Sequence, residues 1–225
     1  IQYGLDAAGN ITERSVAGVG TVRYEYDPAG RMTKVIAPDG KEARYTYDAG
    51  GRLTTTERDL NPKNGQPQVL VTYQRYDSAD RMVAIAHLTK VGSTETLVAG
   101  QAMTRGAGGA ISRIDTYRVG AGFDAAAGSF SGTPATSQAF EYDGNARLTR
   151  ETRSKGAAIT DTVYEYSPAG NRSKKTVTTA SGTEITTYRY DAADRLMEEA
   201  VSLPAGGSRT TVYGWDGNGN LASKS

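Results

Sequence analysis

The sequence predicts an all-β fold, in which consecutive antiparallel β-hairpins form a curved, twisted sheet. Three observations support this prediction. A nine-residue motif recurs along the chain, the segment before each copy alternates in polarity with period two, and the motif itself has the composition of a tight turn. Amphipathic periodicity of 3.6 residues is absent over any long window, so we expect no helix.

The motif is clearest in YEYDPAGRM at residues 24–32 and YTYDAGGRL at residues 45–53. Eight copies align on a central Asp, or on Ser167 in its place, with spacings of 21, 21, 29, 66, 24, 24 and 25 residues. We expect the longest gap to hold a degenerate ninth copy, MTRGAGGAI at 103–111. Twelve of the 14 tyrosines lie within the copies, so chance recurrence is a poor explanation.

Each copy is expected to join two strands. Before the first complete turn, Tyr24 and Tyr26 alternate with Arg23 and Glu25, which places the tyrosines on one face of a strand and the charges on the other. The segment RMTKVI then forms the returning strand, and the sequence APDGK at 37–41 turns the chain again. Other second turns are SGT at 181–183, AGGS at 205–208 and the longer NPKNGQPQ at 61–68.

The turn itself follows from Asp-Pro-Ala-Gly. The carboxylate of Asp27 can accept hydrogen bonds from backbone N–H groups further along, Pro28 restricts φ, and Gly30 permits a positive φ. Three copies lack the Gly and carry Asp80, Ala146 or Asp194 instead. We expect these copies to use a different turn, or an Asp that tolerates the left-handed region.

We therefore expect structural roles for the motif residues. The Asp and Gly form the turn, the aromatic residues stack between neighbouring hairpins, and each Arg pairs with a nearby acid. The residues in question are Tyr24, Tyr26, Asp27, Gly30, Arg31, Tyr45, Tyr47, Asp48, Gly51, Arg52, Tyr76, Asp77, Arg81, Tyr142, Asp143, Arg147, Tyr164, Tyr166, Gly170, Tyr188, Tyr190, Asp191, Arg195, Trp215, Asp216 and Gly219.

The repeats divide into a first block at 1–100 and a second block at 141–225, with all of the chain expected in one continuous repeat sheet. Residues 101–140 hold the degenerate copy and a Gly/Ala/Ser-rich insertion, for which we predict a long flexible loop over roughly 120–137. The first residues, IQYGLDAAGN, read as the middle of a unit, so we interpret the chain as a fragment of a longer protein.

The amino-acid composition argues against several classes of function. The formal net charge is +1, which argues against a nucleic-acid surface, and no apolar run is long enough for a membrane span. Cysteine is absent, which excludes disulfides and thiol nucleophiles. Leu, Ile, Val and Phe together number 35, so the structure is expected to be thin with largely polar faces. We expect no cofactor and no bound metal.

Three functional interpretations of these residues compete with the structural one: a calcium site, a glycan-binding surface and a catalytic triad. Asp216, Asn218 and Asn220 occupy alternating places of a calcium loop, but no bidentate acid follows them. The rows of tyrosines could form a platform for glycans. A catalytic triad would have to use His87, which is the only histidine and lies in a strand-like apolar run without a nucleophile motif. We expect no enzyme.

The recurring Tyr-x-Tyr-Asp-x-x-Gly-Arg-Leu resembles the YD repeat of RHS-repeat proteins, over almost the whole chain. That family includes Rhs polymorphic toxins, the B and C components of insecticidal toxin complexes, wall-associated proteins and teneurins. The resemblance implies a repeat sheet that spirals into a hollow shell, which in the bacterial toxins encloses a C-terminal toxic domain. The family's self-cleaving core segment is not found here, so its aspartates have no counterparts.

The resemblance implies a structural shell segment whose parent encloses and helps to deliver a toxin domain. Its partners would be the rest of its own shell and the enclosed domain, and the parent would be secreted or at the cell surface. The alternative is an extracellular carbohydrate-binding or adhesive module, with glycans as partners. An exposed row of ordered tyrosines would support the alternative, and tyrosines buried between hairpins would oppose it.

Overall fold

A computed structural model describes residues 1–62 and 65–225 of the chain. These residues form β-strands and turns and contain no helix, which confirms the predicted all-β fold of consecutive antiparallel hairpins. Accordingly, the described residues include no helix that could span a membrane. Part of the long second turn predicted at 61–68 lies outside the described residues.

The chain divides into two compact units. Unit 1 comprises Ile1–Met103 and Thr116–Pro134, and unit 2 comprises Thr104–Asp115 and Ala135–Ser225. The strands that lie wholly or largely in unit 1 are β1 (Gln2–Leu5), β2 (Ile11–Val16), β3 (Gly20–Tyr26), β4 (Met32–Ile36), β5 (Glu42–Tyr47), β6 (Leu53–Asp59), β7 (Gln68–Tyr76), β8 (Met82–Val91), β9 (Thr94–Arg105), β11 (Gly122–Asp124) and β12 (Ser129–Ser131).

The strands of unit 2 are β13 (Thr136–Tyr142), β14 (Leu148–Lys155), β15 (Ala158–Tyr166), β16 (Arg172–Thr179), β17 (Gly182–Tyr190), β18 (Leu196–Ser202), β19 (Ser208–Trp215) and β20 (Leu221–Lys224). The remaining strand, β10 (Ile111–Arg118), has residues in both units.

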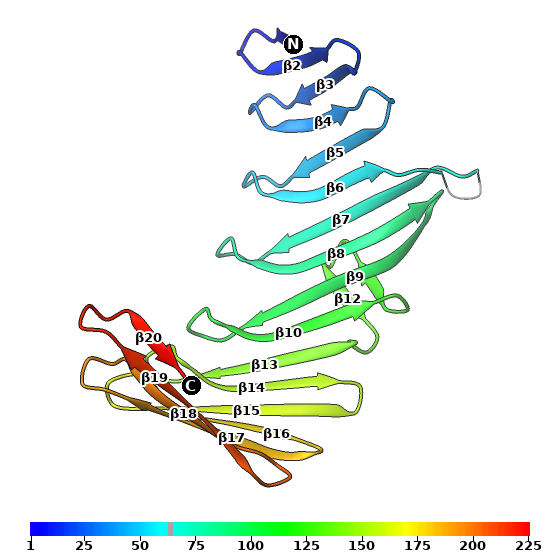
Figure 1. Cartoon of the computed structure of the whole chain (residues 1–225). Helices are drawn as coiled ribbons and strands as arrows, with labels where there is room; N and C mark the ends of the chain where they lie inside the picture. The colour runs from blue at the N-terminus through cyan, green and yellow to red at the C-terminus, as the bar shows by residue number, and fades with distance from the viewer. Residues whose placement is uncertain (63–64) are drawn as a thin grey trace. The chain divides into compact units, whose positions relative to one another are not determined.

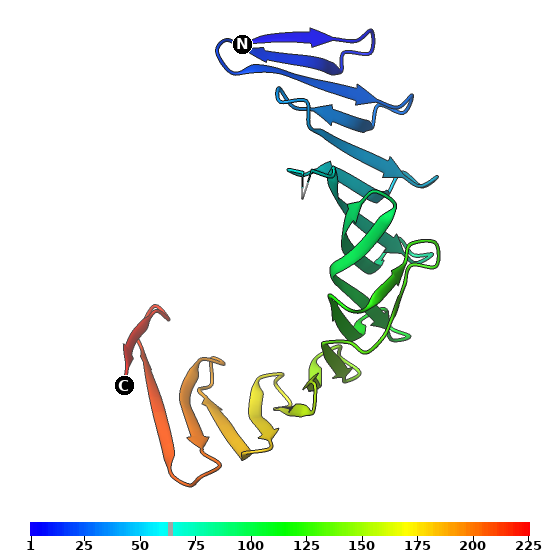
Figure 2. The ribbon, with the colours of Figure 1, turned by 90° about the vertical axis from the view of Figure 1, so that its right-hand side faces the viewer.

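Within each unit, strands that follow one another in the chain pair antiparallel. In unit 1 the pairing runs from β1 to β9, and in unit 2 it runs from β13 to β20. Figures 1 and 2 show β1 to β6 as successive hairpins, each lying beside the next. This order follows from the short turns, because a turn of a few residues can only join neighbouring antiparallel strands.

A one-residue register shift recurs just before the repeat turns, in most copies at the aromatic residue that precedes the turn. It falls between Glu25 and Tyr26 in β3 and between Thr46 and Tyr47 in β5. The corresponding shift in β19 falls between Gly214 and Trp215. Such a β-bulge bends the strand and re-aims the side chain beside it.

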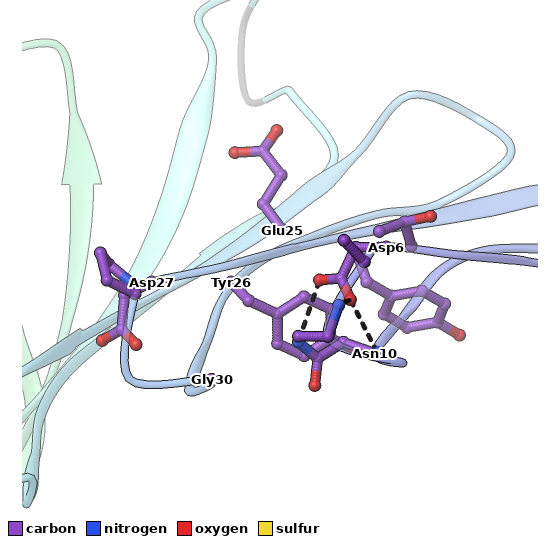
Figure 3. A pocket seen from close by; sticks show the side chains of 11 residues that line it. Asp6, Asn10, Glu25, Tyr26, Asp27 and Gly30 are labelled. Atoms are coloured by element: carbon purple, nitrogen blue, oxygen red, sulfur yellow. Dashed lines mark hydrogen bonds between the residues drawn. The ribbon is translucent and has the colours of Figure 1, made fainter.

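The two faces of the sheet differ in chemistry, as the alternation in the sequence predicts. In Figure 3, Glu25 points away from Tyr26 on β3. Across β3 to β6 of unit 1, the face that carries Glu25 holds a row of ion pairs, which we call the charged face. Its pairs include Lys34–Glu25 at 3.1 Å, Arg44–Glu42 at 2.6 Å and Arg44–Asp59 at 3.3 Å.

The buried core of unit 1 is small and local. Ala86, Leu88, Leu97 and Tyr117 are at most 8% exposed and form one cluster. In unit 2, Val201 pairs with the buried Thr186 across β17 and β18. Most other side chains in the strands are only half-buried. Stability must therefore come largely from backbone pairing and from contacts between neighbouring hairpins.

The Gly/Ala/Ser-rich insertion differs from the predicted long flexible loop. It contains a short hairpin, β11–β12, that pairs Phe123 with Phe130, and β13 begins at Thr136. Both phenylalanines pack against the core cluster of unit 1. The prediction failed here because two apolar side chains seven residues apart determine the structure of a segment whose composition is otherwise that of a loop.

Candidate functional site

The repeated feature of this protein is its turn, which has the same backbone geometry in every copy. In the copy at Asp27, the Asp27 N–H donates to the Arg31 carbonyl at 2.9 Å, and the Gly30 N–H donates to the Asp27 carbonyl at 2.9 Å. Gly30 has a φ of 77°. The same two hydrogen bonds occur in the copies at Asp6, Asp48, Asp77, Asp143, Ser167, Asp191 and Asp216.

The Asp side chain occupies the inside of this turn. Oδ1 of Asp27 accepts hydrogen bonds from the N–H groups of Ala29 at 2.9 Å and Arg31 at 3.0 Å, and Oδ2 accepts one from Nε of Arg31 at 2.7 Å. Matching Arg–Asp pairs hold Asp48, Asp77, Asp143 and Asp191. Both carboxylate oxygens are therefore used within the turn.

These contacts favour the charged carboxylate. The Arg31 N–H lowers the pKa of Asp27, and the Arg52 N–H likewise lowers the pKa of Asp48. The side chain of Arg81 is the main cause that lowers the pKa of Asp77, to about 2. The motif aspartates are thus ionised acceptors of hydrogen bonds at neutral pH, in a chemical state that suits a turn cap.

The aromatic residue before the Asp reaches back to the preceding hairpin. The Tyr47 hydroxyl donates to the Met32 carbonyl at 2.8 Å, and Nε1 of Trp215 donates to the Leu196 carbonyl at 2.9 Å. In each case the acceptor is the backbone carbonyl of the residue five positions after the motif Asp of the preceding turn, or after Gly106 in the ninth copy. Met32, for example, lies five residues after Asp27. The other members of this ladder are Tyr26 to Ile11, Tyr76 to Leu53, Tyr142 to Ile111 and Tyr166 to Leu148.

The motif Arg reaches forward to the next hairpin. The guanidinium of Arg31 lies 4.8 Å from the ring centroid of Tyr47, and its Nη1 donates to the Asp48 carbonyl at 3.4 Å. Arg52 repeats the arrangement over Tyr76 at 5.0 Å. In unit 2, Arg147 lies over Tyr166 at 4.6 Å. At these three places Arg and Tyr together join a hairpin to its neighbour by cation–π contacts and hydrogen bonds.

The copies that depart from the motif keep the same turn. Asp80, Ala146 and Asp194 stand at the Gly position with φ values of 61°, 60° and 58°. Both aspartates form contacts with the preceding hairpin. Asp80 Oδ1 accepts from Nη1 of Arg52 at 2.6 Å, and Asp194 Oδ1 accepts from Nδ2 of Asn171 at 2.6 Å. The expectation of an Asp in the left-handed region is correct, while Ala146 adopts that region without such a contact.

The degenerate ninth copy also forms the turn. The Gly106 N–H donates to the Ala110 carbonyl at 3.0 Å, and the Gly109 N–H donates to the Gly106 carbonyl at 2.9 Å. Gly106 stands where the other copies have Asp, so this turn has no side-chain cap. Arg105 occupies the place of the motif Tyr and donates from Nη1 to the Gly109 carbonyl at 3.0 Å.

A shallow hollow of about 550 Å³ lies between the first two turns, bordered by Asp6, Asn10, Tyr24, Tyr26 and Asp27. Figure 3 shows the Asp6 carboxylate directed at Asn10. Its Oδ1 accepts from the N–H groups of Ala8 and Asn10, and its Oδ2 accepts from Nδ2 of Asn10. The Asp6 carboxylate of this hollow is thus bonded within its own turn, as Asp27 is within the next one.

The geometry does not support the calcium loop at Asp216 or a catalytic role for His87. Oδ1 of Asp216 accepts from the N–H groups of Asn218 and Asn220, and Oδ2 accepts from Nδ2 of Asn220, as in a turn cap. His87 contacts the Thr72 hydroxyl through Nδ1 at 2.9 Å. In the part of the chain that the structure describes, no three acidic or histidine side chains gather as metal ligands.

The motif tyrosines are half-buried, with Tyr142 slightly more open at 38% exposure. Tyr45, Tyr188 and Tyr190 also lie on the tyrosine-bearing face, and burial raises the pKa of Tyr190. The motif predicted aromatic contacts between neighbouring hairpins, but it did not predict the hydrogen bonds of the Tyr hydroxyls to the preceding hairpin or the reach of the Arg side chains to the next one. It also missed the cluster of Tyr73, Tyr117, Phe123 and Phe130, whose only signal was aromatic residues outside the motif.

Comparison with known proteins agrees with the repeat pattern. A family model described as RHS Repeat matches residues 6–42, 26–61 and 175–208. No curated protein matches the sequence. Similar solved structures include TcdB2-TccC3 without its hypervariable C-terminal region, with 16% identity and a TM-score of 0.49, and TcdB2-TccC3-TEV, with 16% identity and a TM-score of 0.48.

A third similar structure is the Tc holotoxin pore of Photorhabdus luminescens with a mutated TccC3, with 14% identity and a TM-score of 0.35. All three comparisons cover 96% of this chain. The chain spans 12% of the length of each TcdB2-TccC3 chain and 15% of the pore chain.

Proposed function

The chain belongs to the RHS-repeat family, and from that premise we propose that it is a wall segment of a shell whose parent protein encloses and helps to deliver a C-terminal toxin domain. The partners of the segment are then the neighbouring repeats of its own shell and the enclosed domain. The parent is a secreted or cell-surface protein. The segment itself carries out no chemistry and serves as a structural scaffold.

One observation carries the structural part of this proposal. Many of the motif side chains are used in contacts within the sheet. The motif Asp is bonded in its own turn, the hydroxyl of the Tyr directly before it is in most copies bonded to the preceding hairpin, and Arg31, Arg52 and Arg147 contact the next hairpin. Groups that are already bonded in this way hold a wall together, and they are not left free to bind a ligand. Enclosure of a toxin domain rests on the family resemblance.

The alternative of a carbohydrate-binding module is less well supported. A sugar stacks on the open face of an aromatic ring, but guanidinium groups lie over the rings of Tyr47, Tyr76, Tyr164 and Tyr166. A ligand would have to displace these arginines, of which Arg31, Arg52 and Arg147 are also paired with aspartates.

Limited proteolysis of the full-length parent tests the proposal. The segment downstream of the repeats is followed by mass spectrometry, beside the same segment produced as a free domain. We expect the segment to survive in the parent under conditions that digest the free domain. Equal rates of digestion would contradict enclosure, and a surface-exposed repeat array would become the better interpretation.

A further inference from the structure

The hairpin β11–β12, which we call the strap (residues 122–131), does not extend the repeat sheet of unit 1. Its two strands form a separate two-stranded sheet. It packs on the core cluster through Phe123 and Phe130, and Figure 1 shows β12 beside β9. The strap is therefore attached by side chains and not by a backbone ladder.

The aromatic contacts of the strap are specific in geometry. Phe130 stacks on Tyr117 with ring centroids 4.3 Å apart and an angle of 4° between the planes. Phe123 lies 5.6 Å from Tyr73 and 4.8 Å from Phe130. The surface beneath them, formed by Tyr73, Ala86, Leu88, Leu97, Gly100 and Tyr117, we call the cradle.

Two glycines make room for this contact. A Cβ on Gly100 of β9 would overlap the ring of Phe130 and would lie 3.0 Å from the Ile85 carbonyl. A Cβ on Gly128 of the strap would lie 2.6 Å from Cγ of Arg75. At Gly100 the aromatic ring occupies the space that a side chain would fill. Any larger residue there would exclude the ring, so the glycine indicates a surface that is fitted to its occupant.

Polar contacts hold the loop of the strap in place. The guanidinium of Arg75 donates to the Ala125 carbonyl from Nη2 and to the Gln74 carbonyl from Nη1, the latter at 2.8 Å. Oδ1 of Asp124 accepts from the N–H groups of Ala126 at 2.8 Å and Ala127 at 2.9 Å, which orders the loop from within. The strap thus resembles a folded peptide that is anchored at two aromatic residues and one carbonyl.

The cradle lies on the charged face. Val71 and Tyr73 pair with Glu57 and Thr55 across β6 and β7, so they continue the side of the sheet that carries the ion pairs. The row of charges is therefore followed by a local apolar area. The described residues of unit 1 have all of their buried hydrophobic side chains in this area, namely Val71, Ala84, Ala86, Leu88, Leu97 and Tyr117.

We propose that the cradle is a recognition site for a hairpin segment that carries two aromatic side chains, and that residues 122–131 occupy it in cis as a separable strap. Aromatic anchors in a fitted pocket, without backbone pairing to the sheet beneath, are features of a docked peptide and not of a strand of that sheet. The site is additional to the wall function, and its failure would leave that proposal unaffected.

The test uses the full chain with residues 122–131 replaced by a Gly/Ser linker of equal length, and a labelled synthetic peptide of residues 121–132. Circular dichroism first compares the variant with the parent chain. We expect the peptide to bind the variant saturably, as measured by fluorescence anisotropy, and not to bind the intact chain. A peptide in which Phe123 and Phe130 are both Ala should bind at least about tenfold more weakly.

Two outcomes would overturn the proposal. One is a folded variant that binds both peptides equally or neither of them. The other comes from a second experiment, used if the linker variant does not fold. In that experiment, hydrogen exchange compares the intact chain with its Phe130→Ala variant. Faster exchange confined to the strap and the adjoining β8–β9 supports a separable strap, whereas unchanged exchange in the strap or general loss of protection in β1–β6 contradicts it.

Discussion

The hydroxyl of Tyr47 lies 2.8 Å from the carbonyl oxygen of Met32, in the hairpin before its own. This hydrogen bond crosses between repeats, and Arg31 from that same preceding hairpin covers the ring of Tyr47. One tyrosine thus connects two hairpins through both its polar end and its ring face. The contact recurs along the chain, so the motif encodes attachment between hairpins as well as the turn.

Tyr47→Phe should lower the free energy of unfolding by about 0.5 to 1.5 kcal/mol, because it removes the hydrogen bond and keeps the ring beneath Arg31. The matched control is Tyr45→Phe on the same strand, whose hydroxyl makes no hydrogen bond with the described residues. Urea unfolding of the two variants measures the difference. Equal destabilisation would show that the ladder bond contributes nothing.

Ala146→Gly should stabilise the chain by about 1 kcal/mol. Ala146 has a φ of 60°, a conformation that costs a residue with a Cβ about 1 to 2 kcal/mol and costs glycine almost nothing. The control is Ala193→Gly, one position earlier in its own turn, which should be neutral or destabilising because its φ is not positive. Thermal unfolding measures both variants, and a lower melting temperature for Ala146→Gly would contradict the strain argument.

Gly106→Asp should also stabilise the chain, by about 0.5 to 1.5 kcal/mol. The backbone of the ninth turn matches the other copies, φ at Gly106 is not positive, and a Cβ there meets no atom within 4 Å. The new carboxylate can therefore accept the turn's N–H groups as Asp27 does. Gly108→Asp, two residues later in an equally open place, is the control and should not stabilise the chain.

Acid should unfold the chain through its turns. Because the folded-state pKa values of the motif aspartates are lowered, the unfolded chain takes up protons first as the pH falls. Their contribution is fully present above the ordinary Asp pKa of about 4 and is lost as the pH falls toward about 2, the pKa of Asp77. Urea midpoints between pH 6 and pH 2 measure this loss.

Two variants check the assignment of this pH dependence. Asp77→Asn should make the urea midpoint less dependent on pH, since one carboxylate with a lowered pKa is removed. Ser167→Asp should make the urea midpoint more dependent on pH. The new carboxylate would have Asn171 four residues later, just as Asp6 has Asn10. The Asn10 side chain lowers the pKa of Asp6, so Asn171 should lower the pKa of the new Asp in the same way. A pH profile that neither variant changes would place the acid-sensitive groups outside the turns.

The sequence by itself determined the features that depend on neighbours close in the chain. The Asp27 carboxylate bonds to Ala29 and Arg31, two and four residues away. The alternation of Tyr24 and Tyr26 with Glu25 needs only the geometry of one strand. Eight copies of one local pattern therefore predicted the hairpins, the all-β class and the identity of the residues in the turns.

Only the tertiary structure decided which groups meet across hairpins and across the insertion. Tyr47 and Met32 are 15 residues apart, Arg52 and Asp80 are 28 apart, and Arg75 reaches Ala125 over 50 residues. Such contacts depend on the register of each strand pair, on the bulge at each motif aromatic residue and on the fit of Phe130 over Gly100. A pattern that repeats every 20 to 25 residues specifies the units, whereas contacts between units depend on how the paired strands place side chains that are far apart in the chain.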